Sequence, residues 1–94
     1  MHWTQDEAIA FEAAKECIGH WMAIHTGMIA DESGKATPDA AIITRLRAKR
    51  SALAQERAGL HIDNQADIAR IRADYGATIR AWRDNTFTAR QSAP

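Results

Sequence analysis

An uncharged stretch of 14 residues in the first third of the chain constrains the fold more than any other feature. It runs from Cys17 to Ala30, between Glu16 and Asp31, and nearly every side chain in it is apolar or small. A helix at the surface of a globular protein normally shows one apolar stripe and one polar face. A helix through residues 17–30 is apolar on both sides. We therefore expect it to pack against its own chain on one side and against a second surface on the other.

The composition is that of a globular protein. Hydrophobic residues make up 46% and charged residues 26% of the 94 positions, and the net charge is zero. A chain of this length predicts one domain, 1–94, near the lower size limit for a self-sufficient core. The uncharged stretch is shorter than the roughly 20 apolar residues that cross a bilayer, so we predict no membrane contact. One cysteine and a polar, acidic beginning without a secretion signal predict a cytoplasmic protein.

The first helix is predicted over about residues 5–30. Thr4 and Glu7 have the spacing of a capping box, in which each side chain satisfies a backbone N–H at the start of a helix. Gly34 and the polar residues before it form a loop that ends the helix. Within this helix, apolar residues recur at alternating spacings of three and four, and this pattern forms a heptad-like seam. The seam consists of Phe11, Ala14, Ile18, Trp21, His25 and Met28.

Two further helices are predicted over about residues 38–58 and 65–84. The second starts at Thr37-Pro38-Asp39 and ends at Gly59, whereas the third is capped by Asp63 or Asn64. We expect residues 85–94 to fray. The apolar faces of these two helices are formed by Ile42, Ile43, Leu46 and Leu53 in the second helix and by Ile68, Ile71, Tyr75, Ile79 and Trp82 in the third.

No strand pattern is visible in the sequence, and the connections between the predicted helices are short. Short connections favour antiparallel neighbours. The predicted fold class is therefore all-α, a three-helix up-down-up bundle with a long first helix, assembled as a homodimer.

A second apolar surface is predicted on the first helix. Gly19, Ala23 and Gly27 stand four residues apart, roughly opposite the main seam. A row of small residues allows another helix to approach closely, although a locally flexible helix is the alternative interpretation. Ile9 and Ile24 also lie off the main seam. These five residues are the predicted partner-binding surface.

Charge is distributed unevenly along the chain. Residues 1–34 carry six acidic side chains against one lysine, a net −5, and residues 35–94 carry eleven basic against six acidic side chains, a net +5. One interpretation is that the two parts pack together with complementary charge. The other is that the basic part faces a polyanion, which makes a nucleic-acid-binding regulator the alternative function. The residues predicted for that function are Arg45, Arg47, Arg70 and Arg80.

No residue pattern indicates catalysis, a cofactor or a metal site. Glu12, Glu16 and His20 form a row on one helix, but no further ligands are indicated elsewhere. Cys17 has no adjacent base that would activate it as a nucleophile. His25 lies within the apolar seam, where we predict a neutral histidine with one hydrogen bond, and a pH-sensitive assembly is the alternative.

These patterns together predict a small, non-enzymatic helical module for protein–protein interaction. We expect it to form a homodimer through the first helix and to bind another protein as an adaptor, inhibitor or regulator.

Overall fold

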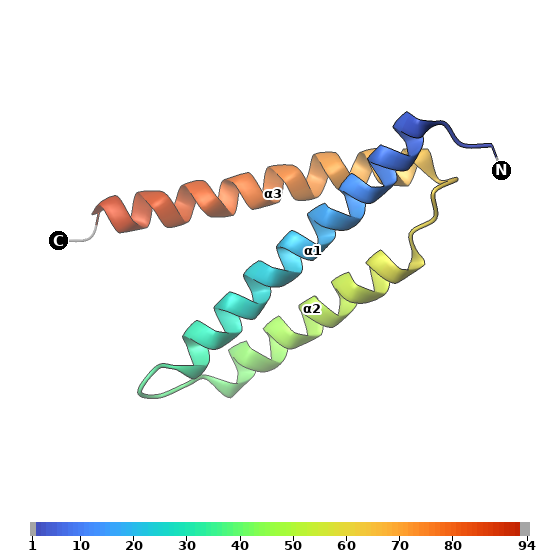
Figure 1. Cartoon of the computed structure of the whole chain (residues 1–94). Coiled ribbons are helices and arrows are strands. Elements are labelled where there is room, and N and C mark those ends of the chain that lie inside the picture. The colour runs from blue at the N-terminus through green and yellow to red at the C-terminus, as the bar shows by residue number, and fades with distance from the viewer. Residues whose placement is uncertain (1, 93–94) are drawn as a thin grey trace.

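The computed structural model describes residues 2–92, and the side chains of residues 2–86. It contains three helices: α1 (Gln5–Ser33), α2 (Ala40–Gly59) and α3 (Gln65–Ser92) (Figure 1). No strand occurs within residues 2–92, so the all-α prediction is confirmed for them. None of the helices there combines the length and apolar character needed to cross a membrane.

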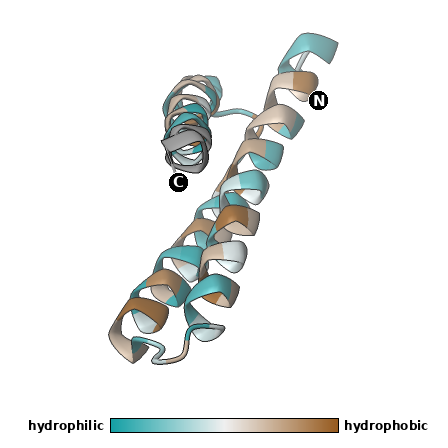
Figure 2. Cartoon of the chain, turned by 90° about the vertical axis from the view of Figure 1, so that its left-hand side faces the viewer, coloured by the Kyte–Doolittle hydropathy of each residue, from teal (hydrophilic) through white to brown (hydrophobic). Residues whose placement is uncertain are grey.

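The three helices form an open layer centred on α1. The helix α2 runs antiparallel beside α1, and α3 returns on the other side in the predicted up-down-up order. Both flanking helices pack against α1, but along their described lengths the backbones of α2 and α3 do not approach each other closely. Figure 1 shows α3 diverging from α1 toward its C-terminal end, and Figure 2 shows α3 to one side of the α1–α2 pair. The predicted bundle is therefore open along one side.

The predicted capping residues start two of the helices. At α1, the Thr4 hydroxyl accepts a hydrogen bond from the backbone N–H of Glu7 at 3.1 Å, and the Glu7 carboxylate accepts one from the Thr4 N–H at 2.7 Å. This is the capping box expected from the sequence. At α3, Asn64 Oδ1 accepts from the N–H of Asp67 at 3.1 Å, so Asn64 is the cap rather than Asp63.

The start of α2 differs from the prediction by two residues. Its N-cap is Asp39, whose carboxylate accepts hydrogen bonds from the N–H groups of Ala41 and Ile42 at 2.9 and 3.3 Å. Thr37 and Pro38 precede the helix. A carboxylate accepts stronger hydrogen bonds than a hydroxyl and interacts favourably with a helix N-terminus, which explains why the cap forms at Asp39.

The end of α3 is the largest difference between the sequence prediction and the fold. The helix continues to Ser92 instead of ending near residue 84. No glycine or proline interrupts residues 85–92, so the residue types there are compatible with a continued helix. The predicted end of the third helix near residue 84 is therefore wrong, whereas fraying of residues 85–92 stays a prediction, and residues 93–94 lie outside the described part. With 28 residues, α3 is almost as long as the 29-residue α1.

The core is small and lies where α1 meets both other helices. Its most completely buried large side chains are Ile18 of α1 and Ile68 and Ile71 of α3. Leu53 is the only buried residue of α2, and the remaining apolar residues of the predicted α2 face are partly exposed. Leu60, directly after α2, folds back onto the same core.

His25 is buried in this seam with 3% of its surface exposed. Its Nδ1 lies 2.8 Å from the backbone carbonyl of Trp21, and a carbonyl only accepts, so Nδ1 carries the proton. The Trp21 ring meets the imidazole edge-on with 4.7 Å between the ring centres. The predicted core histidine with one hydrogen bond is thereby confirmed.

Candidate functional site: a groove between the first and third helices

The divergence of α3 from α1 leaves an open groove between these two helices. It consists of two hollows, of about 890 and 330 Å³, that both include His20 in their walls. We call them the basic hollow and the apolar hollow, and together the α1–α3 groove. The basic hollow is lined by Ala13, Glu16, Cys17 and His20 of α1 and by Ala69, Arg72, Ala73, Gly76, Ile79, Arg80 and Arg83 of α3. The apolar hollow is lined by His20, Ala23, Ile24, Gly27, Met28 and Asp31 of α1 and by Trp82 of α3.

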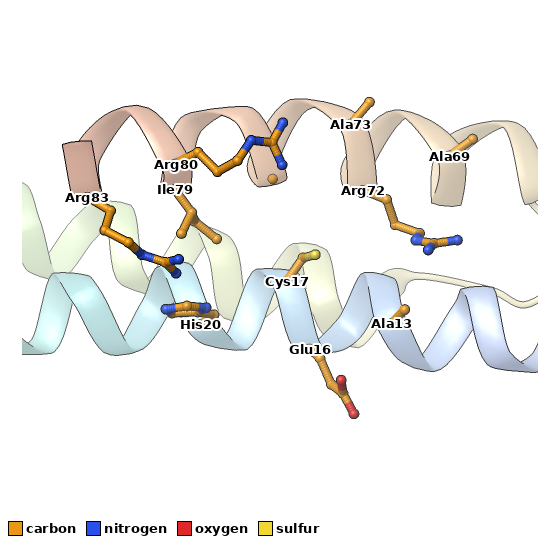
Figure 3. Close-up of a pocket in the computed structure, with 11 residues that line it drawn as sticks. Ala13, Glu16, Cys17, His20, Ala69, Arg72, Ala73, Ile79, Arg80 and Arg83 are labelled. Carbon is orange, nitrogen blue, oxygen red and sulfur yellow. The ribbon is translucent and has the colours of Figure 1, made fainter. Parts of the chain in front are cut away.

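Three arginines of α3 give the basic hollow its character (Figure 3). Arg72 and Arg83 extend from α3 toward α1, and Arg83 ends near the ring of His20. Arg80 lies along its own helix. The one acidic residue of the hollow, Glu16, points away from α3, so its carboxylate does not neutralise the arginines.

The spacing of residues along α3 produces this basic edge. Arg72, Gly76, Ile79 and Arg83 follow one another at intervals of four, three and four, which places them on one side of the helix beside its apolar stripe. A Cβ at Gly76 would lie 3.3 Å from Nη1 of Arg80, so the glycine leaves room for that guanidinium along the helix.

The apolar hollow lies on the C-terminal half of α1. Ile24 and Met28 of α1 and Trp82 of α3 are partly exposed in its walls. Gly27 has nothing within 4 Å of the position where a Cβ would stand, so the helix surface is open there. Partly exposed isoleucine, methionine and tryptophan around an open hollow provide the apolar anchors that protein interfaces use.

The structure brings together three of the five residues predicted as the partner-binding surface, namely Ala23, Ile24 and Gly27. Gly19 lies apart from them, because a Cβ at Gly19 would be 3.2 Å from Nη1 of Arg57 on α2. Ile9 is 58% exposed and lines a separate hollow near the start of α1.

Sequence reasoning assigned Trp82 to the core-facing stripe of α3 and missed its place in the groove. The sequence indicated that Trp82 is the last residue of the stripe, after the buried Ile79. It did not indicate that α3 diverges from α1 at this point, because the divergence depends on packing between distant segments.

The four arginines predicted to contact nucleic acid do not form one surface. Arg70 is surrounded by carboxylates, with Asp67 at 2.6 Å, Glu56 at 3.4 Å and Asp74 at 3.9 Å. The hydrogen bond to Asp67 and the nearby charges raise the pKa of Arg70, so its guanidinium stays charged and already has carboxylate partners within the chain. Arg80 lies in the α1–α3 groove, whereas Arg45 and Arg47 are exposed on α2.

The opposite charges of the two parts of the chain do not meet as ion pairs. Among the side chains of residues 2–86, no ion pair within 4 Å joins α1 to α2 or α3. Within the same part of the chain, eight basic side chains have no carboxylate within that distance. These are Arg45, Arg47, Lys49, Arg50, Arg57, Arg72, Arg80 and Arg83.

A polar cluster connects α2 and α3 outside the groove. Tyr75 Oη donates a hydrogen bond to Glu56 Oε1 at 2.5 Å, and Arg70 adds its ion pair to the same carboxylate. Burial of the phenol, together with this hydrogen bond, raises the pKa of Tyr75 to about 12. The cluster borders a hollow of about 380 Å³ beside Trp21 and His25. Each polar group in it has a partner within the chain, so we interpret it as structural.

The groove contains a thiol and an imidazole, Cys17 and His20, but not a metal-ligand set. Among the described residues, no group of three or more histidine, cysteine or acidic side chains is placed to hold a metal ion. Cys17 is a free, half-buried thiol. No protein-family model, curated protein or solved structure matches this chain, so its function is inferred from the geometry of the groove.

Proposed function

We propose that this protein is a non-enzymatic protein-interaction module that self-associates and uses the α1–α3 groove as its binding surface. In this role it acts as an adaptor, inhibitor or regulator of another protein. A reducing cytoplasm suits the free thiol of Cys17 in the groove wall.

The observation that carries the proposal is the openness of the fold. The radius of gyration is 16.1 Å, against about 12 Å for a compact domain of the same length. The accessible surface is 6545 Å², against about 5,400 Å² for a compact monomer of this size. The excess, on the order of 1,000 Å², is similar to the roughly 800 Å² that each partner buries in a standard protein interface.

The position of the excess surface supports the groove as the interface. Closing the bundle would bring the inner side of the diverging α3 against the C-terminal half of α1. The walls of the groove between them carry Ile24, Met28 and Trp82. A second polypeptide in the groove covers these side chains and gives α3 a neighbour along its C-terminal half.

Self-association is tested by measuring the solution mass by light scattering at two protein concentrations and at low and moderate salt. We expect a dimer at the higher concentration. Ala23→Glu places a carboxylate in the apolar hollow and is expected to reduce the mass to that of the monomer while circular dichroism keeps its helical signal. Ala48→Glu, an exposed position on α2 outside the groove, is the matched control and is expected to remain dimeric.

Two results contradict the proposed function. The first is a wild-type chain that is monomeric at every concentration and that captures no protein partner through the groove. The second is an Ala23→Glu variant with the same mass as the wild type, which excludes the apolar hollow as the interface.

Nucleic-acid binding is the alternative function, and the basic side chains without carboxylate partners support it. Arg45 and Arg47 are exposed on α2, and Arg80 stands at the groove. Phosphate contacts release counterions, so such binding weakens steeply as salt increases. A fluorescently labelled duplex and a labelled single strand, titrated at two salt concentrations, test it. Absent or salt-insensitive binding removes this alternative.

A further inference from the structure

We infer that the α1–α3 groove receives α1 of a second copy in antiparallel orientation, with Glu16 of each copy paired to Arg83 of the other. This inference rests on the proposed self-association. It adds the surface of the second copy that enters the groove, the orientation of that copy and the ion pair that determines the orientation. It follows from the charges, the apolar anchors and the excess surface of the groove.

The first step is that the groove presents opposite charges that do not pair within the chain. Arg72 and Arg83 extend toward α1, but Glu16, in the wall of the same hollow, points away from α3. Neither Glu16 nor Arg83 takes part in an ion pair among residues 2–86. The carboxylate is directed outward, so another molecule can meet it together with the arginine edge.

The second step is that a second copy satisfies both charges at once. In a two-fold symmetric interface, the surface of one copy meets the same surface of the other, so each contact occurs twice. A surface that carries both an acid and a base is self-complementary in this arrangement. Because the net charge of the chain is zero, no overall repulsion opposes the approach of the copies.

The third step is the orientation. Glu16 and Arg83 contribute to the basic hollow, and the apolar hollow continues the groove from His20 toward the end of α1. An antiparallel α1 centred near His20 places Glu16 of the second copy one helical turn beyond this centre, opposite Ile24 and beside Arg83. A parallel α1 in the same register would place the two Glu16 carboxylates side by side, which is unfavourable.

The fourth step is the apolar part of the contact. Trp82, Ile24 and Met28 surround the small residues Ala23 and Gly27. Small residues permit close approach of the second helix, and a tryptophan at the rim is a residue type that dominates interface energies. The charges then determine the orientation of two surfaces that apolar burial holds together.

A charge-exchange experiment tests the inference. Glu16→Arg and Arg83→Glu are prepared separately and combined in one chain, and masses are measured by light scattering. Each single variant places like charges opposite each other twice per dimer, so we expect its dissociation constant to rise by at least about tenfold. The combined variant restores the pair with its signs exchanged and is expected to dimerise again. An equimolar mixture of the two single variants is expected to form a heterodimer, because both of its contacts are then between opposite charges, one as in the wild type and the other with its signs exchanged.

Recovery of dimerisation in the combined variant and in the mixture is the deciding result, and Arg47→Glu on α2 is the control for a charge reversal outside the groove. Circular dichroism verifies that each variant remains helical. If the single variants dimerise like the wild type, or if they dissociate and the combined variant does not recover, Glu16 and Arg83 do not meet and the inference is wrong. Self-association through the apolar hollow then still stands. A wild-type monomer overturns both proposals.

Discussion

Tyr75 of α3 and Glu56 of α2 are joined by a hydrogen bond of 2.5 Å between the phenol and the carboxylate. Arg70 reaches the same carboxylate at 3.4 Å. Within residues 2–86 these are the only polar side-chain contacts between the two helices, whose backbones remain apart. The contact links two helices that, within the described side chains, otherwise meet only through α1 and the core.

We predict that Tyr75→Phe lowers the free energy of unfolding by about 1–2 kcal/mol, because a hydrogen bond to a charged group is lost while the ring remains. Urea unfolding measures this change. Glu56→Gln and the double variant complete a double-mutant cycle. We expect the double variant to lose less than the sum of the two single losses. Strict additivity would show that the hydrogen bond contributes nothing to stability.

The same contact predicts how Tyr75 titrates. Its pKa is raised from 10.0 to about 12, so the folded state holds the phenolic proton more tightly than the unfolded state. This contribution to stability is complete below pH 10 and is lost as the pH rises toward 12. Tyr75 is the only tyrosine, so the ultraviolet absorbance of tyrosinate reports it alone. A folded protein whose tyrosine titrates at the same pH as in denaturant would contradict the prediction.

A second pH dependence is predicted at the α1–α2 connection. The Glu32 carboxylate accepts hydrogen bonds from Lys35 Nζ at 2.8 Å and from the N–H of Asp39 at 3.0 Å, and these partners lower its pKa below 4.5. The contribution to stability is therefore present above pH 4.5 and is lost as the pH falls through the lowered pKa.

Melting temperatures of the wild type and of Glu32→Gln at neutral and acidic pH measure this effect. We expect the variant to melt below the wild type at neutral pH and the difference to shrink in acid. Asp31→Asn, at the exposed neighbouring position, is the control. An unchanged difference at both pH values would show that ionisation of Glu32 is unimportant.

The local features of the fold could be predicted from the sequence because they depend on neighbouring residues. The capping box of Thr4 and Glu7 and the buried spacing of Ile68 and Ile71 require only helical periodicity. The cap of α2 was misplaced by two residues because Thr37 followed by Pro38 has the pattern of a helix start, although Asp39 is the stronger capping residue.

The groove could not be predicted in the same way because it depends on the angle between distant helices. Arg70 pairs with Asp67 and Asp74 on its own helix, but it also reaches Glu56 on another helix, which no spacing along the sequence indicates. The row from Gly19 to Gly27 was treated as one surface. The helix turns enough between these two residues that Gly19 faces Arg57 of α2 and only Gly27 opens to the groove.

A core substitution is predicted to have a large effect because few residues form the core. Ile18 is fully buried among α1, α2 and α3 side chains, and Ile18→Ala is expected to cost about 2–5 kcal/mol of unfolding free energy. Ile18→Val removes one methylene and is expected to cost about 0.5–1.5 kcal/mol. Chemical denaturation of both variants measures the series. A loss for the alanine variant no greater than that for valine would contradict the assigned packing.

The two glycines of the predicted small-residue row are expected to respond differently to substitution. Both have ordinary helical backbone conformations without positive φ, so Gly19→Ala and Gly27→Ala should each raise the unfolding free energy of the monomer by up to about 1 kcal/mol. At Gly19 the new methyl meets only the movable end of Arg57, which can shift. Self-association should therefore be unchanged by Gly19→Ala.

At Gly27 the methyl enters the groove surface, so Gly27→Ala should weaken self-association while it stabilises the monomer. Denaturation at low concentration and light scattering at high concentration separate the two effects. Equal effects of both substitutions on the dimer would show that the C-terminal half of α1 does not approach the second copy closely.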